Sequence, residues 1–220
     1  MLATEIEAKP FLKWAGGKRQ LLEQFELEYP VTLKNNEIKT YIEPFVGGGA
    51  VFFELTKHYN FEKIVLNDAN HELINTYKSV KNEVDAVIER LKEMEEEYLP
   101  LETEKRKEIY YARRDNFNTE KKELNFNEFT KAHIEHAAKF IFLNRTCFNG
   151  LYRQNQSGEF NVPIGRYKNP TICNEENLIA VSKALENVIL TSGDFEKTEK
   201  YIEDQTFIYI DPPYRPLPGT

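Results

Sequence analysis

The sequence of 220 residues predicts an α/β fold in which a parallel sheet carries a long, mostly helical insertion. Two observations predict the sheet. Short runs of apolar and β-branched residues end in Gly, Asp or Pro, and helix-like stretches separate these runs. A third observation predicts the insertion, because residues 71–143 carry a mostly helical pattern between the second and third of these runs.

Four strand-like segments end in turns that carry chemically useful side chains. The segments are residues 41–45, 63–66, 188–191 and 206–210. The turns at their ends contain Val46-Gly47-Gly48-Gly49, Asn67-Asp68, Gly193-Asp194-Phe195 and Asp211-Pro212-Pro213-Tyr214. In an open α/β sheet, ligands bind at the carboxyl ends of the strands, near a topological switch point. We therefore expect all four turns to lie around one site.

Composition and charge exclude several classes of protein. The content of 40% hydrophobic and 30% charged residues is that of a globular protein, and the net charge of −7 argues against a broadly basic polyanion binder. The only two cysteines, Cys147 and Cys173, lack the paired spacing of a metal site. The N-terminus has no apolar signal region and no apolar run approaches the length of a membrane span, so we expect a cytoplasmic protein without membrane partners.

The predicted insertion changes character along its length. The acidic run at residues 93–97 has the composition of a solvated helix face. Between Lys139 and Lys168, five basic residues stand against one acid, Glu159, and six aromatic residues accompany them. Such a local patch in an acidic protein indicates site-directed nucleic-acid binding. Aromatic packing of a helix end and a hairpin explains the same residues equally well.

The glycine turn at residues 47–49 and Asp68 together indicate a nucleoside-like cofactor. Glycines between a strand and a helix let the backbone approach a ligand where a Cβ atom would clash. Asp68 ends the next strand 19 residues after Gly49, near the spacing at which an acidic residue reaches a ribose hydroxyl. The glycine spacing argues against a nicotinamide dehydrogenase, and the H-x-E at residues 133–135 lacks the Cys-x-x-Cys that a zinc deaminase requires.

The turn Asp211-Pro212-Pro213-Tyr214 is the most informative of the four. Pro212 favours an extended Asp211, and two fixed φ angles make the turn stiff. The turn offers a carboxylate, a backbone carbonyl and an aromatic face. An adenine amino group needs this set, because its nitrogen becomes a better nucleophile when the carboxylate and the carbonyl accept its two hydrogens. Tyr214 would stack on the base, which must be flipped out of the duplex.

Five motifs, taken in order, resemble the Dam-type DNA adenine-N6 methyltransferases. They are Phe11–Lys18, Tyr41–Gly49, Phe148–Arg153, Gly158–Pro163 with Gly165–Lys168, and Asp211–Tyr214. The resemblance extends from about Lys9 to the last residue. It implies a Rossmann-like S-adenosylmethionine-dependent methyltransferase sheet, built from residues 1–70 and 186–220, with a mostly helical target-recognition insertion at residues 71–185.

The resemblance also implies an activity and a set of site residues. The activity is methyl transfer from S-adenosylmethionine to adenine N6 in double-stranded DNA, within GATC, with no metal. The implied catalytic residues are Asp211, Pro212, Pro213 and Tyr214. The implied cofactor-binding residues are Trp14, Lys18, Glu43, Phe45, Gly47, Gly49, Asp68, Asp194, Phe195 and Asp211. The implied DNA-binding residues are Lys13, Phe148, Asn149, Leu151, Arg153, Pro163, Arg166 and Lys168, of which Arg153 suits bidentate recognition of guanine.

The sequence stops six residues after Tyr214, whereas relatives of the Dam type continue for several strands and helices. We expect this ending to leave a strand edge that a second polypeptide could pair with. We also expect these 220 residues alone to bind the cofactor weakly and not to turn over, because no later segment would hold the catalytic turn. The alternative to an enzyme is an inactive truncated or split-subunit remnant that binds DNA or a partner.

Overall fold

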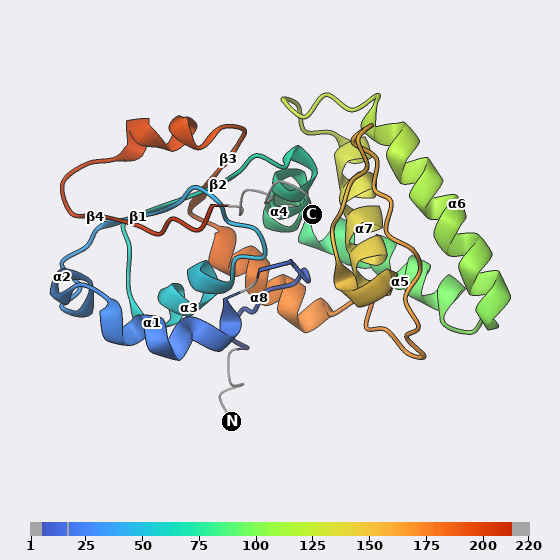
Figure 1. Ribbon diagram of the computed structural model, residues 1–220, viewed down its shortest axis with the longest axis horizontal. Coiled ribbons are helices and arrows are strands. Elements are labelled where there is room, and N and C mark those ends of the chain that lie inside the picture. The colour runs from blue at the N-terminus through green and yellow to red at the C-terminus, as the bar shows by residue number, and fades with distance from the viewer. Residues whose placement is uncertain (1–5, 17, 213–220) are drawn as a thin grey trace, which may run out of the picture.

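The computed structural model describes residues 6–16 and 18–212, and these residues form four parallel strands in one sheet (Figure 1). The strands are β1 (Thr40–Glu43), β2 (Lys63–Asp68), β3 (Val188–Ser192) and β4 (Thr206–Ile208), and they lie in the order β3-β2-β1-β4. Each neighbouring pair is parallel. The prediction of an α/β fold with a Rossmann-like parallel sheet is therefore confirmed.

The strand order places a topological switch point at β1. The chain runs from β1 to β2 and β3 on one side, and β4 then returns to pair with β1 on the other side. Ile42 lies opposite Val65 of β2 and Ile208 of β4. All four residues of β1 are buried, as expected for a strand covered on both faces. The carboxyl end of β1 is thus the place where an open α/β sheet binds its ligands.

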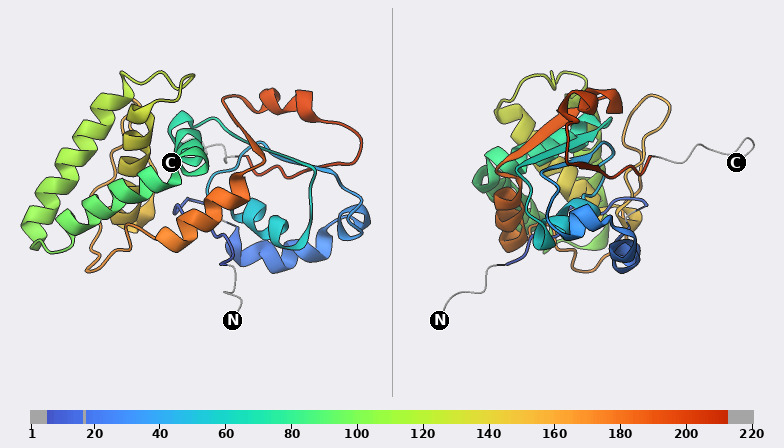
Figure 2. Two further views of the ribbon diagram at one scale, coloured as in Figure 1. Left: turned by 180° about the vertical axis from the view of Figure 1, so that it is seen from behind. Right: turned by 90° about the vertical axis from the view of Figure 1, so that its left-hand side faces the viewer.

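Helices flank the sheet on both faces. Figures 1 and 2 show α1 (Leu22–Glu28), α3 (Ala50–His58) and α8 (Glu175–Leu185) on one face of the sheet, with the 3-10 helix η3 (Phe195–Tyr201) on the other. The short elements η1 (Arg19–Leu21) and α2 (Val31–Lys34) lie beside α1. The turn before α3 contains Gly49 in the left-handed conformation, at φ +72°. This conformation favours glycine, since it has no Cβ atom.

A group of helices follows β2 and forms the second half of the structure. Its members are α4 (His71–Asn82), α5 (Val84–Tyr98), α6 (Thr103–Lys121) and α7 (Lys131–Thr146), followed by the 3-10 turn η2 (Phe148–Gly150). Helix α7 lies at the centre of this group, and ten of its 16 residues are buried. Helix α4 contacts β2 and β3 as well as α7, so it connects the sheet to the helical group.

The segment after η2 returns along α7 as an irregular hairpin, which Figure 1 shows beside that helix. Two isolated antiparallel bridges hold it together, Cys147 with Ile164 and Gln154 with Phe160. The hydroxyl of Tyr110 on α6 donates to the carbonyl of Val162 at 2.8 Å, which fastens the hairpin to the helical group. We call residues 147–168 the recognition hairpin, because most of the predicted DNA-binding residues lie on it.

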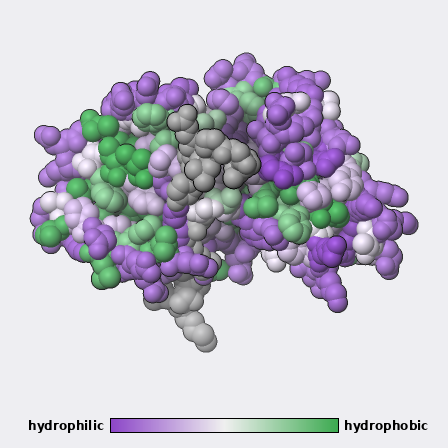
Figure 3. Space-filling view, in the orientation of Figure 1, coloured by the Kyte–Doolittle hydropathy of each residue, from purple (hydrophilic) through white to green (hydrophobic). Residues whose placement is uncertain are grey.

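The surface of the two halves differs. Figure 3 shows mainly hydrophilic residues over the outer part of the helical group and patches of apolar residues on the half that carries the sheet. Exposed apolar side chains in that half include Leu27, Val31, Ile202 and Ile210. Within residues 6–16 and 18–212, none of the helices combines the length and the apolar character that crossing a bilayer requires.

The packing of the sheet predicts that two leucines contribute very different amounts to the free energy of unfolding. Leu66 in β2 is fully buried, whereas Leu27 on α1 is 77% exposed. We expect Leu66→Ala to lower the free energy of unfolding by about 2–5 kcal/mol, because it opens a cavity in the core. The matched variant Leu27→Ala should change it by less than about 0.5 kcal/mol. Urea denaturation measures both values, and equal losses in the two variants would contradict the description of the core.

Candidate active site

A cavity of about 320 Å³ opens at the carboxyl ends of β1, β2 and β4. Its walls come from the turns after these strands and from residues 14–18. The predicted residues that line it are Trp14, Lys18, Glu43, Phe45, Gly47, Gly49, Asp68, Asp211 and Pro212. A larger open groove of about 900 Å³ lies between α3 and α8, near the amino ends of β2 and β3. Ligands of such sheets bind at the carboxyl ends, so the smaller cavity is the candidate site.

The glycine turn after β1 packs directly beneath Trp14. Gly47 has a φ of +49°, and a Cβ atom built on it would lie 2.8 Å from the Trp14 ring. A Cβ atom on Gly49 would lie 2.6 Å from the hydroxyl of Tyr77. That hydroxyl donates to the Gly47 carbonyl at 3.2 Å. The turn therefore needs glycine for its backbone conformation and also for the closeness of two aromatic side chains.

Asn67 and Asp68 hold the turns at this edge of the sheet together. The backbone N–H of Gly47 donates to one Asp68 carboxylate oxygen at 3.0 Å, and that of Asn70 donates to the other at 2.9 Å. The buried Asn67 side chain donates to the carbonyls of Pro44 and Gly193, at 3.1 Å in each case. Each Asp68 oxygen keeps further acceptor capacity for a ligand hydroxyl. Burial raises the pKa of Asp68, although the two backbone N–H groups oppose this change.

Glu43 is buried in the cavity wall. The hydroxyl of Tyr41 donates to its Oε2 at 2.7 Å. Burial raises the pKa of Glu43 to about 8, and the negative charges of Asp211 and Asp68 act in the same direction. The hydrogen bonds from Tyr41 and from the backbone of Phe52 oppose the rise. With this pKa the carboxyl group is mostly protonated at neutral pH.

Two motifs that are far apart in the sequence meet at the open side of the cavity. The Lys18 ammonium lies 3.2 Å from Oδ1 of Asp211, and both side chains are partly exposed. This ion pair joins the motif at residues 11–18 to the end of the last described strand. Pro212 lines the cavity beside Asp211. Pro213 and Tyr214, the other predicted catalytic residues, lie outside the described residues.

Two predicted cofactor-binding residues do not line this cavity. Asp194 caps η3, where its Oδ1 accepts from the N–H of Glu196 at 3.0 Å. Phe195 is 48% exposed, and its ring centroid lies 5.8 Å from that of Phe45. Since Phe45 is part of the wall, Phe195 borders the cavity through a second aromatic ring.

The predicted DNA-binding residues lie on the recognition hairpin and beside it. Those with exposed side chains are Phe148, Asn149, Leu151, Arg153, Pro163, Arg166 and Lys168. Lys13 is half-buried, and its Nζ lies 4.3 Å from the ring centre of Tyr167 on the hairpin. Asn144 holds the Lys13 backbone by two hydrogen bonds of 2.8 Å. The hairpin and the motif at residues 11–18 are therefore one connected surface.

The aromatic residues between 139 and 168 have mixed roles. Phe140, Phe142 and Phe160 are buried, and Tyr152 and Tyr167 are half-buried. Only Phe148, among these six, is exposed. Core packing therefore accounts for most of the aromatic content of this segment, and Phe148 is the exposed ring among these six.

Sequence reasoning missed several residues that shape the site. Asn67 and Tyr77 support the glycine turn, Tyr209 lines the cavity, and Tyr152 stacks on Trp14 with ring centroids 5.2 Å apart. The motif that contains Tyr152 was visible in the sequence. Its side-chain direction was not, because that depends on the path of the hairpin.

The buried carboxyl group of Glu43 predicts a pH effect on stability. Between its ordinary pKa of 4.5 and the folded value of about 8, the unfolded chain releases a proton that the folded chain keeps. The free energy of unfolding therefore falls as the pH rises through this range. Glu43→Gln does not titrate, so we expect this variant to gain stability relative to the wild type, by a few kcal/mol, between pH 5 and pH 8. Urea denaturation at several pH values measures the difference.

Glu54 on α3 provides a control with the opposite sign. The hydrogen bond from Lys57 lowers the pKa of Glu54, so this carboxylate contributes stability that is lost as the pH falls through its folded pKa. Glu54→Gln should therefore lose stability relative to the wild type as the pH rises through that range. A pH-independent difference between Glu43→Gln and the wild type would contradict the assignment of a raised pKa to Glu43.

The chain is similar in sequence to several known DNA methyltransferases. The chain is 53% identical over 215 residues to the type II methyltransferase M.MjaIII of Methanocaldococcus jannaschii, a match that covers 98% of this chain and 72% of the relative. It is 38% identical over 216 residues to a DNA adenine methylase of Haemophilus influenzae, covering 98% and 67%. It is 34% identical over 212 residues to a DNA adenine methylase of Escherichia coli, covering 96% and 67%.

The family model of the D12 class N6 adenine-specific DNA methyltransferases matches residues 14–220, which include every wall of the cavity and the whole recognition hairpin. The family that was expected from the five motifs is therefore confirmed. The chain belongs to the D12 class of N6 adenine-specific DNA methyltransferases.

Proposed function

We propose that this chain transfers a methyl group from S-adenosylmethionine to the N6 amino group of adenine in double-stranded DNA, within the sequence GATC. One observation carries the proposal. Asp211 and Pro212 line the same cavity as the glycine turn and Asp68, so the group that would hold the adenine adjoins the candidate cofactor site. The target GATC rests on the resemblance of the recognition hairpin to that of Dam-type enzymes.

The residues of the cavity fit S-adenosylmethionine. When bound, this cofactor supplies an electrophilic methyl group on a positively charged sulfur. Because Gly47 has no Cβ atom, Trp14 can pack directly on the glycine turn and form part of the cavity wall. Asp68 keeps acceptor capacity for ribose hydroxyls, and Phe45 and Phe195 offer aromatic surface at the border. Asp68 and Asp211 give the cavity an acidic character that suits a cationic ligand.

In this proposal Asp211 and Pro212 orient the amino group of adenine. The ion pair with Lys18 uses Oδ1 of Asp211, so Oδ2 can accept one amino hydrogen. The carbonyl of Pro212 can accept the other, since the next residue is a proline without an N–H. Acceptance of both hydrogens exposes the nitrogen lone pair for attack on the methyl group. Tyr214 would stack on the flipped base.

Several sequence-based expectations belong to the same proposal. They are the division into residues 1–70 with 186–220 and residues 71–185, the roles of the individual cofactor-binding and DNA-binding residues, the second polypeptide and the cytoplasmic location. The competing proposal is an inactive remnant that binds DNA without methylating it. Transfer of tritium from labelled S-adenosylmethionine to a GATC duplex distinguishes the two proposals.

Replacement of Asp211 tests the catalytic role. Asp211→Asn keeps the shape of the side chain but exchanges a charged acceptor for a weaker, neutral one. We expect the single-turnover rate to fall by about 10²–10³-fold, as for the loss of one preorganised electrostatic contact. The rate is measured with tritiated S-adenosylmethionine and a GATC duplex.

The matched control is Asp204→Asn, at an exposed position outside the cavity. This control should keep the wild-type rate. If Asp211→Asn also keeps a rate close to that of the wild type, Asp211 does not hold the amino group, and the proposed role is wrong.

Arg153 tests how the sequence of the DNA is read. Its Nε donates to Oδ1 of Asn161 at 2.9 Å, an arrangement that orients the exposed guanidinium group. We expect Arg153→Ala to reduce discrimination at one guanine by about 1–3 kcal/mol. Lys168→Ala should instead weaken binding to all sequences alike, as loss of a phosphate contact does. Binding across single-base variants of GATC measures both effects. A uniform loss in Arg153→Ala would place Arg153 on the DNA backbone.

A further inference from the structure

Tyr152 lies between two predicted DNA-binding residues but points away from their side. The hairpin is extended here, and successive side chains in extended backbone point in opposite directions. Leu151 and Arg153 are exposed, whereas Tyr152 is half-buried against the body of the protein. The backbone that presents Leu151 and Arg153 to the outside therefore also sets the position of the Tyr152 ring.

The ring of Tyr152 packs against Trp14, which lines the cavity. It stacks on Trp14, with ring centroids 5.2 Å apart and planes inclined by 15°. Gly47 also approaches the indole so closely that a Cβ atom would lie 2.8 Å away. Trp14 thus contacts both the recognition hairpin and the glycine turn. A displacement of Tyr152 would change the wall that the candidate cofactor meets.

The hydroxyl group fastens Tyr152 to the same edge of the sheet. It donates to the buried carboxylate of Glu72, in the first turn of α4. Burial raises the pKa of Tyr152 well above its ordinary value, so the hydroxyl remains a donor at neutral pH. Glu72 follows Asn70, whose N–H binds Asp68, by two residues. Tyr152 therefore contacts both Trp14 and the helix that begins after Asp68.

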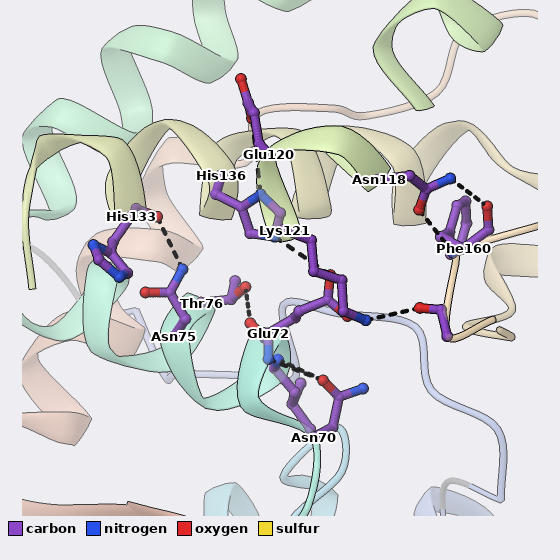
Figure 4. A network of polar contacts seen from close by, with 12 residues as sticks. Asn70, Glu72, Asn75, Thr76, Asn118, Glu120, Lys121, His133, His136 and Phe160 are labelled. Atoms are coloured by element: carbon purple, nitrogen blue, oxygen red, sulfur yellow. Dashed lines mark hydrogen bonds and ion pairs between the residues drawn. The ribbon is translucent and has the colours of Figure 1, made fainter. Parts of the chain in front are cut away.

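Glu72 is a fixed anchor for this hydroxyl. Figure 4 shows its side chain next to Lys121 of α6 and His136 of α7. Its carboxylate accepts from Lys121 at 2.7 Å and contacts Nε2 of His136 at 3.3 Å. Burial raises its pKa, but the hydrogen bonds from His136, Lys121 and Tyr152 outweigh burial and hold the pKa of Glu72 below its ordinary value. The carboxylate therefore stays charged, and three helices hold it in place.

We propose that Tyr152 is a positioning residue that couples the binding of DNA on the recognition hairpin to the binding of the cofactor beside Trp14. This inference rests on the proposed function, which places the two ligands at these sites. When DNA fixes Leu151 and Arg153, the Tyr152 ring is fixed against Trp14, and the cavity wall is set for the cofactor. By linkage, the cofactor then tightens the binding of DNA by the same factor.

A binding cycle measures this coupling directly. The dissociation constant of S-adenosylhomocysteine is determined with and without a saturating GATC duplex, and that of the duplex with and without S-adenosylhomocysteine. Trp14 is the only tryptophan, so its fluorescence reports on the cavity wall itself. We expect each ligand to tighten the binding of the other about fivefold or more in the wild-type protein, within the range of ordinary coupling energies.

Three variants separate coupling from simple packing. Tyr152→Leu, which removes the ring, should reduce the coupling factor to less than about twofold and shift the Trp14 emission. Tyr152→Phe keeps the ring beside Trp14 but loses the hydrogen bond to Glu72, so its coupling factor should lie between those of the wild type and Tyr152→Leu. The matched control is Phe160→Leu, because Phe160 packs on Tyr152 and Phe117 in the same aromatic cluster. We expect Phe160→Leu to lower the unfolding temperature and to keep the coupling.

Each outcome has one meaning. If Tyr152→Leu keeps the wild-type coupling, or if Phe160→Leu loses as much coupling as Tyr152→Leu, Tyr152 has only a packing role and the inference is wrong. If the wild type binds both ligands without coupling, the inference is also wrong, whereas the proposed function stands. If the wild type binds neither ligand, the proposed function fails, and this inference fails with it.

Discussion

The candidate site depends on the contacts that Asn67 and Asp68 make across the carboxyl edge of the sheet. Asp68 accepts the N–H groups of Gly47 and Asn70, and Asn67 binds the carbonyls of Pro44 and Gly193. The turns that follow β1, β2 and β3 thus share two adjacent side chains. Without these hydrogen bonds the turns would leave buried polar groups unpaired, at a cost of about 1–3 kcal/mol for each group. The edge is therefore held rigid where a ligand needs fixed donors and acceptors.

The glycine turn is connected to the recognition hairpin through packed aromatic side chains. Because Gly47 has no Cβ atom, Trp14 can lie directly on the turn, and Tyr152 and Phe140 can then stack against the indole group. The same aromatic cluster continues to Phe117 and Phe160 on the helical group and the hairpin. A single packed stack therefore runs from the sheet edge to the hairpin that carries the predicted DNA-binding residues. Such close packing leaves little free volume around the rings.

The carboxyl groups of the cavity also limit which ligand it can hold. Glu43, Asp68 and Asp211 bring three carboxyl groups to one small space, and Lys18 neutralises part of this charge through its ion pair with Asp211. The fold limits the remaining repulsion by keeping Glu43 protonated, since burial raises its pKa to about 8. A cationic ligand would relieve the repulsion further, because an opposite charge nearby favours the ionised form of a carboxyl group. The electrostatics of the cavity therefore suit the cationic cofactor that we propose.

The sequence by itself determined the local features: the strand ends, the glycine turn, and the positions of Asp68 and Asp211 at the edge of the sheet. These can be predicted because each depends on residue type and on the rule that parallel strands end at one edge. The family could be predicted too, because each of its motifs is a short continuous stretch of the sequence. Only the tertiary structure decided that Tyr77 supports Gly47, that Tyr152 packs on Trp14, and that Glu43 is buried deeply enough to stay protonated. It also decided that most aromatic residues of the basic patch belong to the core. These outcomes depend on contacts between residues far apart in the chain and on how much water each group loses, and no spacing in the sequence records either quantity.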